Sequence, residues 1–253
     1  MKQSVRSISL PALCLAITFV YTSSANGQSL DDYRSKTPLT GSWKDAASWE
    51  RYNCSSWVNA GTYPTDANTH NITVRSGSTL SVSSALTVDD LTIDAGGTVT
   101  NSSTLTYGPT IRTLNGTLSS SGTLTMDGSA FVYGTLRNSG TVSANAYNIW
   151  IRTGGTYQHD DATTAGTIPA CSWETGSTLL VTGYTSSTEE LSLLVNPELE
   201  NLTWNCTAQT GAIPFPSDFS SIHGTFTIAS TIASRFAAEG SACFLFSFAF
   251  AVT

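Results

Sequence analysis

A short repeat between residues 85 and 160 limits the folds that this chain can adopt. A Gly-Thr-apolar triplet returns about every 18 to 21 residues, a period typical of stacked repeat architectures. The triplets begin at Gly97, Gly116, Gly134 and Gly155, and a second apolar column runs through Leu86, Leu105, Leu124 and Val142. One repeat has only a few inward side chains, so it buries an apolar face only by stacking on its neighbours.

Apolar and polar residues alternate within each repeat, as in residues 86–88 and 91–93. This alternation turns one side chain inward and the next outward along a β-strand, and Thr and Val suit a pleated surface. Gly, Asn, Asp and Ser separate the runs and favour turns. The sequence therefore predicts an all-β fold, a right-handed parallel β-helix (β-solenoid). An antiparallel β-sandwich is the alternative, and columns at a near-constant period favour the solenoid.

The segments around the repeat divide the chain further. Residues 1–27 are predicted to be a secretory signal peptide, because Lys2 and Arg6 precede an apolar run and a small-residue cleavage site. We expect an N-terminal cap over residues 28–61, solenoid coils over 62–161 and a second β block over 162–233 that continues the solenoid. Residues 234–253 form an atypical apolar tail. It either caps the last coil or marks the chain as a piece of a longer protein, and we favour the second interpretation.

The composition and the signal peptide narrow the location and the partners. Only 11% of the residues are charged and the net charge is −7, so the chain lacks the basic surface that nucleic acids require. The apolar tail is too short to cross a bilayer, so no membrane span is expected after signal cleavage. The signal peptide predicts a secreted, extracellular or cell-surface location.

Four cysteines follow the predicted signal peptide: Cys54, Cys171, Cys206 and Cys243. Export permits disulfides, and four cysteines allow three pairings. Cys171 and Cys206 are the favoured pair because each lies two residues from a tryptophan. Two coils apart means about 10 Å, which is beyond disulfide reach, so this pair requires a single coil with a long excursion. No Cys/His spacing indicates zinc, and no metal or cofactor is expected.

An aromatic cluster near the N-terminus contains Trp43, Trp49, Tyr52 and Trp57. The end of a solenoid must be covered, or its first coil exposes core and strand edges. We therefore interpret the cluster as an N-terminal aromatic cap. The functional alternative is a platform on which Trp43, Trp49 and Trp57 stack against sugar rings.

Two groups of motifs carry a family resemblance. The first group is Gly41-Ser42-Trp43, Ser48-Trp49, Pro64, Asp66, Ile72-x-Val74 and Gly96-Gly97, and the second is Gly176-Ser177-Thr178 with Asn201-Leu202-Thr203-Trp204-Asn205-Cys206. Together they resemble secreted and surface parallel β-helix proteins of Bacteroidota, with their G8-like and autotransporter-adhesin-like repeats. The resemblance covers most of residues 41–233. It implies a fold and a place at the cell surface rather than a chemistry.

Parallel β-helices often act on polysaccharides, which requires a base with a cation or paired carboxylates about 5–10 Å apart. The charged candidates are Asp94, Asp127, Asp160, Asp161, Arg112, Arg137 and Arg152, and they do not align with the Gly-Thr columns. The densest polar spot is Asp160-Asp161 beside His159, which we interpret as a solvated turn. No catalytic residue is predicted.

The sequence thus favours a non-catalytic secreted or cell-surface β-solenoid with a structural or adhesive role. One alternative is a carbohydrate-binding or polysaccharide-processing β-helix protein, and another is a fragment of a larger surface protein. The candidate ligand-binding residues are Trp43, Trp49, Trp57, Asp160 and Asp161. Extracellular glycans and surface proteins are the expected partners.

Overall fold

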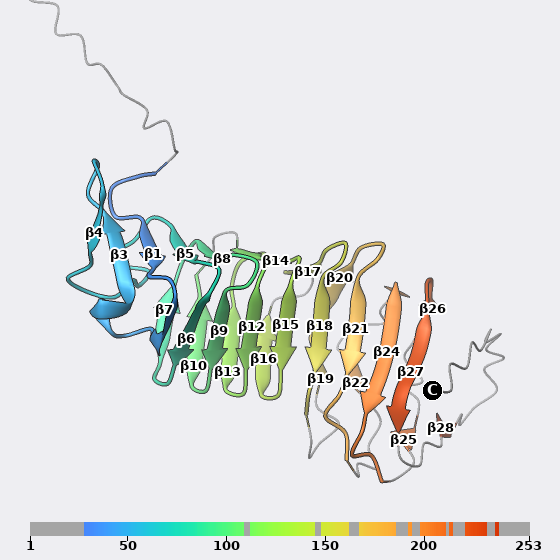
Figure 1. The fold of residues 1–253 in the computed structure, drawn as a ribbon. Helices are drawn as coiled ribbons and strands as arrows, with labels where there is room; N and C mark the ends of the chain where they lie inside the picture. Colours follow the sequence, from blue (N-terminus) through green and yellow to red (C-terminus); the bar gives the residue numbers. More distant parts are fainter. Residues whose placement is uncertain are drawn as a thin grey trace, which may run out of the picture.

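The structure is a computed structural model that describes residues 28–108, 112–144, 148–161, 167–185, 192–193, 198–210, 213–214, 221–231 and 236–237. The predicted signal peptide and Cys243 lie outside the described residues, as does most of the predicted apolar tail. Short strands follow one another along the described chain and stack coil upon coil in one long array (Figure 1). The predicted all-β solenoid is therefore confirmed, while its right-handedness stays a prediction.

Three sheets form the walls of the solenoid. Sheet A has nine strands in the order β20 (Cys171–Trp173), β17 (Ile149–Ile151), β14 (Ala130–Val132), β11 (Arg112–Leu114), β8 (Leu91–Ile93), β5 (Ile72–Val74), β1 (Tyr33–Ser35), β3 (Trp49–Tyr52) and β4 (Trp57–Asn59). Sheet B has nine in the order β2 (Leu39–Ser42), β6 (Ser78–Val82), β9 (Thr98–Asn101), β12 (Thr117–Ser120), β15 (Thr135–Asn138), β18 (Thr156–His159), β21 (Thr178–Val181), β24 (Asn201–Cys206) and β27 (Phe226–Thr231). Sheet C has four: β16 (Thr141–Ala144), β13 (Thr123–Met126), β10 (Thr104–Tyr107) and β7 (Leu86–Val88).

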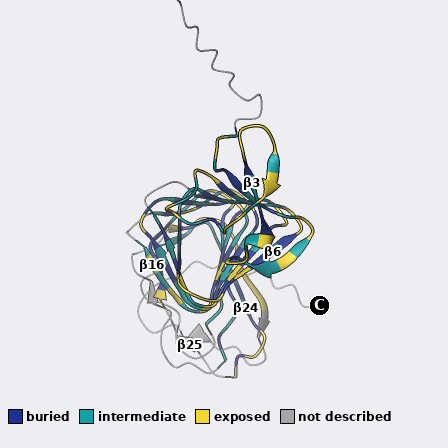
Figure 2. Cartoon of the chain, turned by 90° about the vertical axis from the view of Figure 1, so that its left-hand side faces the viewer, coloured by how far each residue is buried: buried dark blue, intermediate teal, exposed yellow. Residues whose placement is uncertain are grey.

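Three two-stranded pairs lie in the later coils. They join β19 (Thr167–Ile168) to β22 (Ser192–Leu193), β23 (Glu198–Leu199) to β26 (Ser221–Ile222), and β25 (Ile213–Pro214) to β28 (Phe236–Ala237). Four other strands after residue 161, β20, β21, β24 and β27, continue sheets A and B in parallel. Viewed from the end that carries β3, the three sheets surround one interior (Figure 2).

The N-terminal strands begin the stack before residue 62. β1 pairs in parallel with β5, and β2 pairs in parallel with β6. A 3-10 helix, Ala46–Ser48, then leads into β3 and β4, which extend sheet A by antiparallel pairing. Among the described strands only these two pairings are antiparallel. Whether this segment closes the core, as the predicted cap would, stays a prediction.

Register between coils builds the core from columns of like residues. The inward column of sheet B runs Leu80, Val99, Leu118, Leu136, Tyr157, Leu179 and Leu202, and all seven are buried. The apolar column predicted in sheet C is also confirmed, because Leu86, Leu105, Leu124 and Val142 lie opposite one another. Each column repeats about every 4.8 Å, so apolar side chains of successive coils pack directly on each other.

The Gly-Thr repeat forms the corner between sheets A and B. Each glycine carbonyl accepts a hydrogen bond from the threonine N–H of the next coil, as from Thr135 to Gly116 at 2.9 Å and from Thr156 to Gly134 at 2.8 Å. A Cβ on Gly134 would lie 2.1 Å from the Gly116 carbonyl oxygen, and one on Gly155 would lie 2.0 Å from the Val132 carbonyl oxygen. The repeat requires glycine because adjacent coils leave no room for a side chain.

A column of buried polar residues lies at the ends of successive sheet B strands. It consists of Asn101, Ser120, Asn138 and His159, which lie opposite one another in successive coils. The Asn101 amide donates to the Ser120 hydroxyl and to the Thr123 carbonyl, both at 3.0 Å. The Asn138 side chain bonds both the N–H and the carbonyl of Gly140. These bonds satisfy backbone groups at a corner that the sheet ladders do not reach.

Replacing Gly134 by Ala tests the corner packing. We expect Gly134→Ala to lower the free energy of unfolding by about 1–3 kcal/mol, because the added methyl group forces neighbouring backbone apart. The matched control is Gly61→Ala, since no atom lies within 4 Å of a Cβ built there. Urea denaturation followed by far-UV circular dichroism measures both. Equal stability of the two variants would contradict the steric explanation.

Candidate functional site

The N-terminal tryptophans lie in different environments. Trp43 and Trp49 are fully buried and meet edge to face, with ring centroids 4.8 Å apart. The Trp43 indole N–H donates to the Pro64 carbonyl, and the Trp49 indole N–H donates to the Trp43 carbonyl. Neither ring therefore offers a face to a ligand, and both belong to the core. The proposed sugar-stacking platform is wrong for these two residues.

Trp57 is partly exposed, but another side chain covers its ring. The Arg34 guanidinium lies 4.2 Å from the ring centroid, and the Tyr52 ring packs at 5.4 Å. Arg34 Nε also bonds Glu50 Oε2 at 2.7 Å. The structure thus places Trp57 in a group of aromatic, cationic and anionic side chains at the edge of sheet A.

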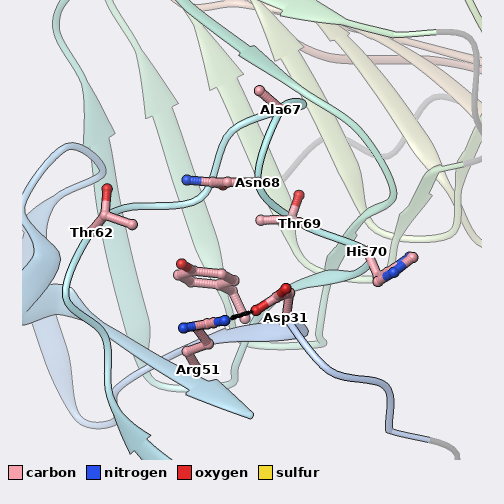
Figure 3. Close-up of a pocket in the computed structure, with 8 residues that line it drawn as sticks. Asp31, Arg51, Thr62, Ala67, Asn68, Thr69 and His70 are labelled. Atoms are coloured by element: carbon pink, nitrogen blue, oxygen red, sulfur yellow. Dashed lines mark hydrogen bonds and ion pairs between the residues drawn. The ribbon is translucent and has the colours of Figure 1, made fainter. Parts of the chain in front are cut away.

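A shallow pocket of about 420 Å³ lies beside this segment (Figure 3). Its lining residues are Asp31, Tyr33, Arg51, Thr62, Ala67, Asn68, Thr69 and His70. Two of its charged side chains, Arg51 and Asp31, form an ion pair with each other (dashed in Figure 3). The Asn68 side chain accepts from the Thr65 N–H and donates to the Tyr63 carbonyl. Burial raises the pKa of Tyr33, so its hydroxyl stays neutral. These contacts hold the loop in place and leave the pocket little free chemistry.

Asp160 forms an ion pair that links neighbouring coils. Arg137 Nε donates to Asp160 Oδ2 at 2.8 Å, and the Thr182 hydroxyl donates to Oδ1 at 2.8 Å. The Arg137 side chain is largely exposed. Asp161 follows as a half-buried residue with interactions of its own. A paired carboxylate on the surface matches the expected solvated turn better than a catalytic group.

Arg112, another charged candidate, points into the solenoid. Its Nη2 donates to the Gly108 carbonyl and lies 4.0 Å from Asp89 Oδ1. Its guanidinium carbon lies 5.0 Å from the centroid of the Tyr107 ring. Burial lowers the pKa of Arg112, but an arginine remains protonated at neutral pH. The side chain is almost completely buried. It therefore supports a coil corner and cannot reach a substrate.

Among the residues that the structure describes, exposed aromatic rings gather on the outer face of sheet A, where no site was predicted. We call Phe131, Tyr133, Trp150, Arg152 and Glu174 the outer aromatic patch. Phe131 of β14 and Trp150 of β17 occupy the same register, with ring centroids 6.4 Å apart. Tyr133 and Trp150 are 46% and 36% exposed. The Arg152 guanidinium lies 4.4 Å from the Phe131 ring and bonds Glu174.

A signal for this patch was present in the sequence. Phe131 lies between Ala130 and Val132, and Trp150 lies between Ile149 and Ile151. With inward neighbours on both sides, strand alternation requires both aromatic rings to face outward. The Gly-Thr columns lie at the neighbouring corner and on sheet B, so they do not mark these two outward positions of sheet A.

The predicted disulfide between Cys171 and Cys206 is wrong. Both cysteines are free and buried. Cys54 is also free, but it is exposed. Cys171 begins β20 in sheet A, whereas Cys206 ends β24 in sheet B, one coil further along. The Cys206 thiol instead donates to the Val181 carbonyl at 3.6 Å. Proximity to a tryptophan in sequence did not indicate proximity in space, because the two strands belong to different walls.

Within the described ranges, no group of three or more His, Cys, Asp or Glu side chains is placed to hold a metal ion. The same part of the chain contains no helix long and apolar enough to cross a membrane. No protein-family model, curated protein or solved structure matches this chain. The candidate sites therefore stand on their own geometry.

Thiol reactivity tests the cysteine assignment. Burial raises the pKa of Cys206 to about 11, and it also raises the pKa of Cys171. At pH 8, three units below a pKa of 11, only about one Cys206 thiol in a thousand is the reactive thiolate. We expect iodoacetamide to label Cys54 in the folded protein, and Cys171 and Cys206 only after unfolding. Peptide mass spectrometry without reductant measures this, and a linked Cys171–Cys206 peptide would refute free thiols.

Proposed function

We propose that this protein is exported and acts outside the cell or on its surface as a non-catalytic β-solenoid with a structural or adhesive role. The observation that supports this most is the regular, hydroxyl-rich outer face of the coils. On sheet B, one outward column is threonine in six successive coils: Thr79, Thr98, Thr117, Thr135, Thr156 and Thr178. Sheet C repeats the pattern with Thr104, Thr123 and Thr141.

Such columns suit a stable extended scaffold. Each threonine is β-branched and lies opposite the threonine of the next coil, an arrangement that stabilises neighbouring strands. A regular face of this kind can contact another surface at many points, and several weak contacts together give strong attachment. The repeat, the predicted signal peptide and the low charge all favour this role.

Catalysis has less support from the described side chains. Hydrolysis of glycosides needs two free carboxylates across a cleft, and elimination needs a base near a cation. The carboxylates of Asp31, Glu50, Asp160 and Glu174 are instead each paired with an arginine. We therefore favour an adhesive role over polysaccharide processing.

A deletion strain tests the proposed function. We expect loss of the gene to lower adherence of the producing cells by more than half, because the scaffold supplies many attachment points. The full chain should restore adherence, and a version without residues 1–27 should not. Protease added to intact cells should remove the protein. Unchanged adherence of the deletion strain, or rescue by the leaderless chain, would contradict the proposal.

Activity assays on the purified protein complete this test. We expect no new reducing ends and no unsaturated products from neutral or acidic polysaccharides. Sustained product release that scales with protein concentration would replace the adhesive role by an enzymatic one.

A further inference from the structure

We propose that the outer face of sheet A binds an extended, uncharged polysaccharide, with the outer aromatic patch as its main contact. This inference rests on the adhesive function proposed above and names the ligand class. It also moves the carbohydrate-binding residues away from the N-terminal tryptophans.

The aromatic rings are presented to solvent by strand register. β14 and β17 are neighbours in sheet A (Figure 1), and Phe131 lies directly opposite Trp150 on the outward side. Trp150 is 36% exposed and Tyr133, just after β14, is 46% exposed. Large aromatic side chains gain free energy by leaving water, so the exposed rings of Trp150 and Tyr133 beside Phe131 mark a contact surface. The C–H faces of a pyranose ring offer the flat apolar surface that such rings accept.

Polar groups stand within the patch where sugar hydroxyls need partners. Arg152 lies between the three rings, at 4.4 Å from Phe131, 5.6 Å from Trp150 and 5.9 Å from Tyr133. Glu174 bonds Arg152 and also accepts from the Thr153 N–H at 3.3 Å. Charged donors and acceptors form stronger hydrogen bonds to neutral hydroxyls than neutral groups do. Because the arginine and the glutamate balance each other, the patch favours an uncharged ligand over an acidic one.

The outward column of sheet A that contains Trp150 and Phe131 is long enough to bind an extended ligand. From Trp150 it continues through Phe131, Thr113, Thr92 and Thr73 to Arg34. These five steps between strands span about 24 Å at about 4.8 Å each. At the far end, Arg34 lies over the Trp57 ring and pairs with Glu50, which gives a second group of aromatic, cationic and anionic side chains. A polysaccharide lying along the solenoid axis could contact both ends and the threonines between them.

Affinity gel electrophoresis tests this proposal with the purified protein. The gels contain hydroxyethyl cellulose, xyloglucan, galactomannan or laminarin as neutral probes, and polygalacturonate or alginate as acidic probes. We expect at least one neutral polysaccharide to retard the protein. Trp150→Ala should weaken that binding about tenfold, as loss of a central aromatic contact commonly does.

Two arginine variants provide a matched comparison. Arg152 and Arg137 each pair with a carboxylate on the outer surface, but Arg137 belongs to sheet B. Arg152→Ala should weaken binding several-fold, whereas Arg137→Ala should leave it unchanged. Circular dichroism melting curves confirm that each variant folds, and Tyr133→Ala replaces Trp150→Ala if the latter does not.

Each outcome decides the ligand class. Retardation by a neutral polysaccharide that Trp150→Ala or Tyr133→Ala weakens about tenfold supports the proposal. Absence of retardation, binding that both aromatic variants retain, or binding only to acidic polysaccharides would overturn it. If deletion of the gene lowers adherence while no polysaccharide binds the patch, the adhesive function survives and the glycan ligand does not. If adherence is also unchanged, both proposals fail.

Discussion

The close approach of successive coils is the constraint on which the whole structure depends. At the corner between sheets A and B, glycine carbonyls accept hydrogen bonds from threonine N–H groups one coil later. A single Cβ at Gly134 would meet backbone at 2.1 Å, so this spacing leaves no tolerance. Once it is set, the strand residues of sheets A, B and C lie opposite their equivalents in the preceding coil. The apolar core columns, the buried polar column and the outer threonine columns all follow from that one register.

The same register explains why candidate function lies on the outer walls. Inside the solenoid, stacked coils leave apolar columns and a few buried polar groups, and even Arg112 lies against Gly108 and Tyr107. On the outer walls, equivalent positions of neighbouring strands tend to hold the same residue type. Two aromatic residues in adjacent strands are therefore enough to replace a threonine column by an aromatic one. Phe131 and Trp150 do this in adjacent coils of sheet A. The outer aromatic patch is therefore a local departure from a regular surface.

Much of the fold was accessible from the residues alone. The Gly-Thr triplets and the column from Leu86 to Val142 predicted parallel stacking, and the structure confirms that register. The site was less accessible. The sequence left both a buried role and a sugar-stacking role open for Trp43 and Trp49, because an aromatic residue suits a core and a binding surface, and only their burial decided between the two. Phe131 and Trp150 were predictable from alternation, but only once their strands had been assigned.

The sequence by itself determined the period, the strand alternation and the glycine corners, because these follow from local sterics that repeat in every coil. The tertiary structure alone decided which walls distant residues share. It separated Cys171 from Cys206 on different sheets, and it joined Arg137 to Asp160 and Arg152 to Glu174 across coils. Which side chains pair across coils depends on how many residues each coil of the solenoid contains. The repeat length varies from coil to coil, so only the folded chain fixes which side chains meet.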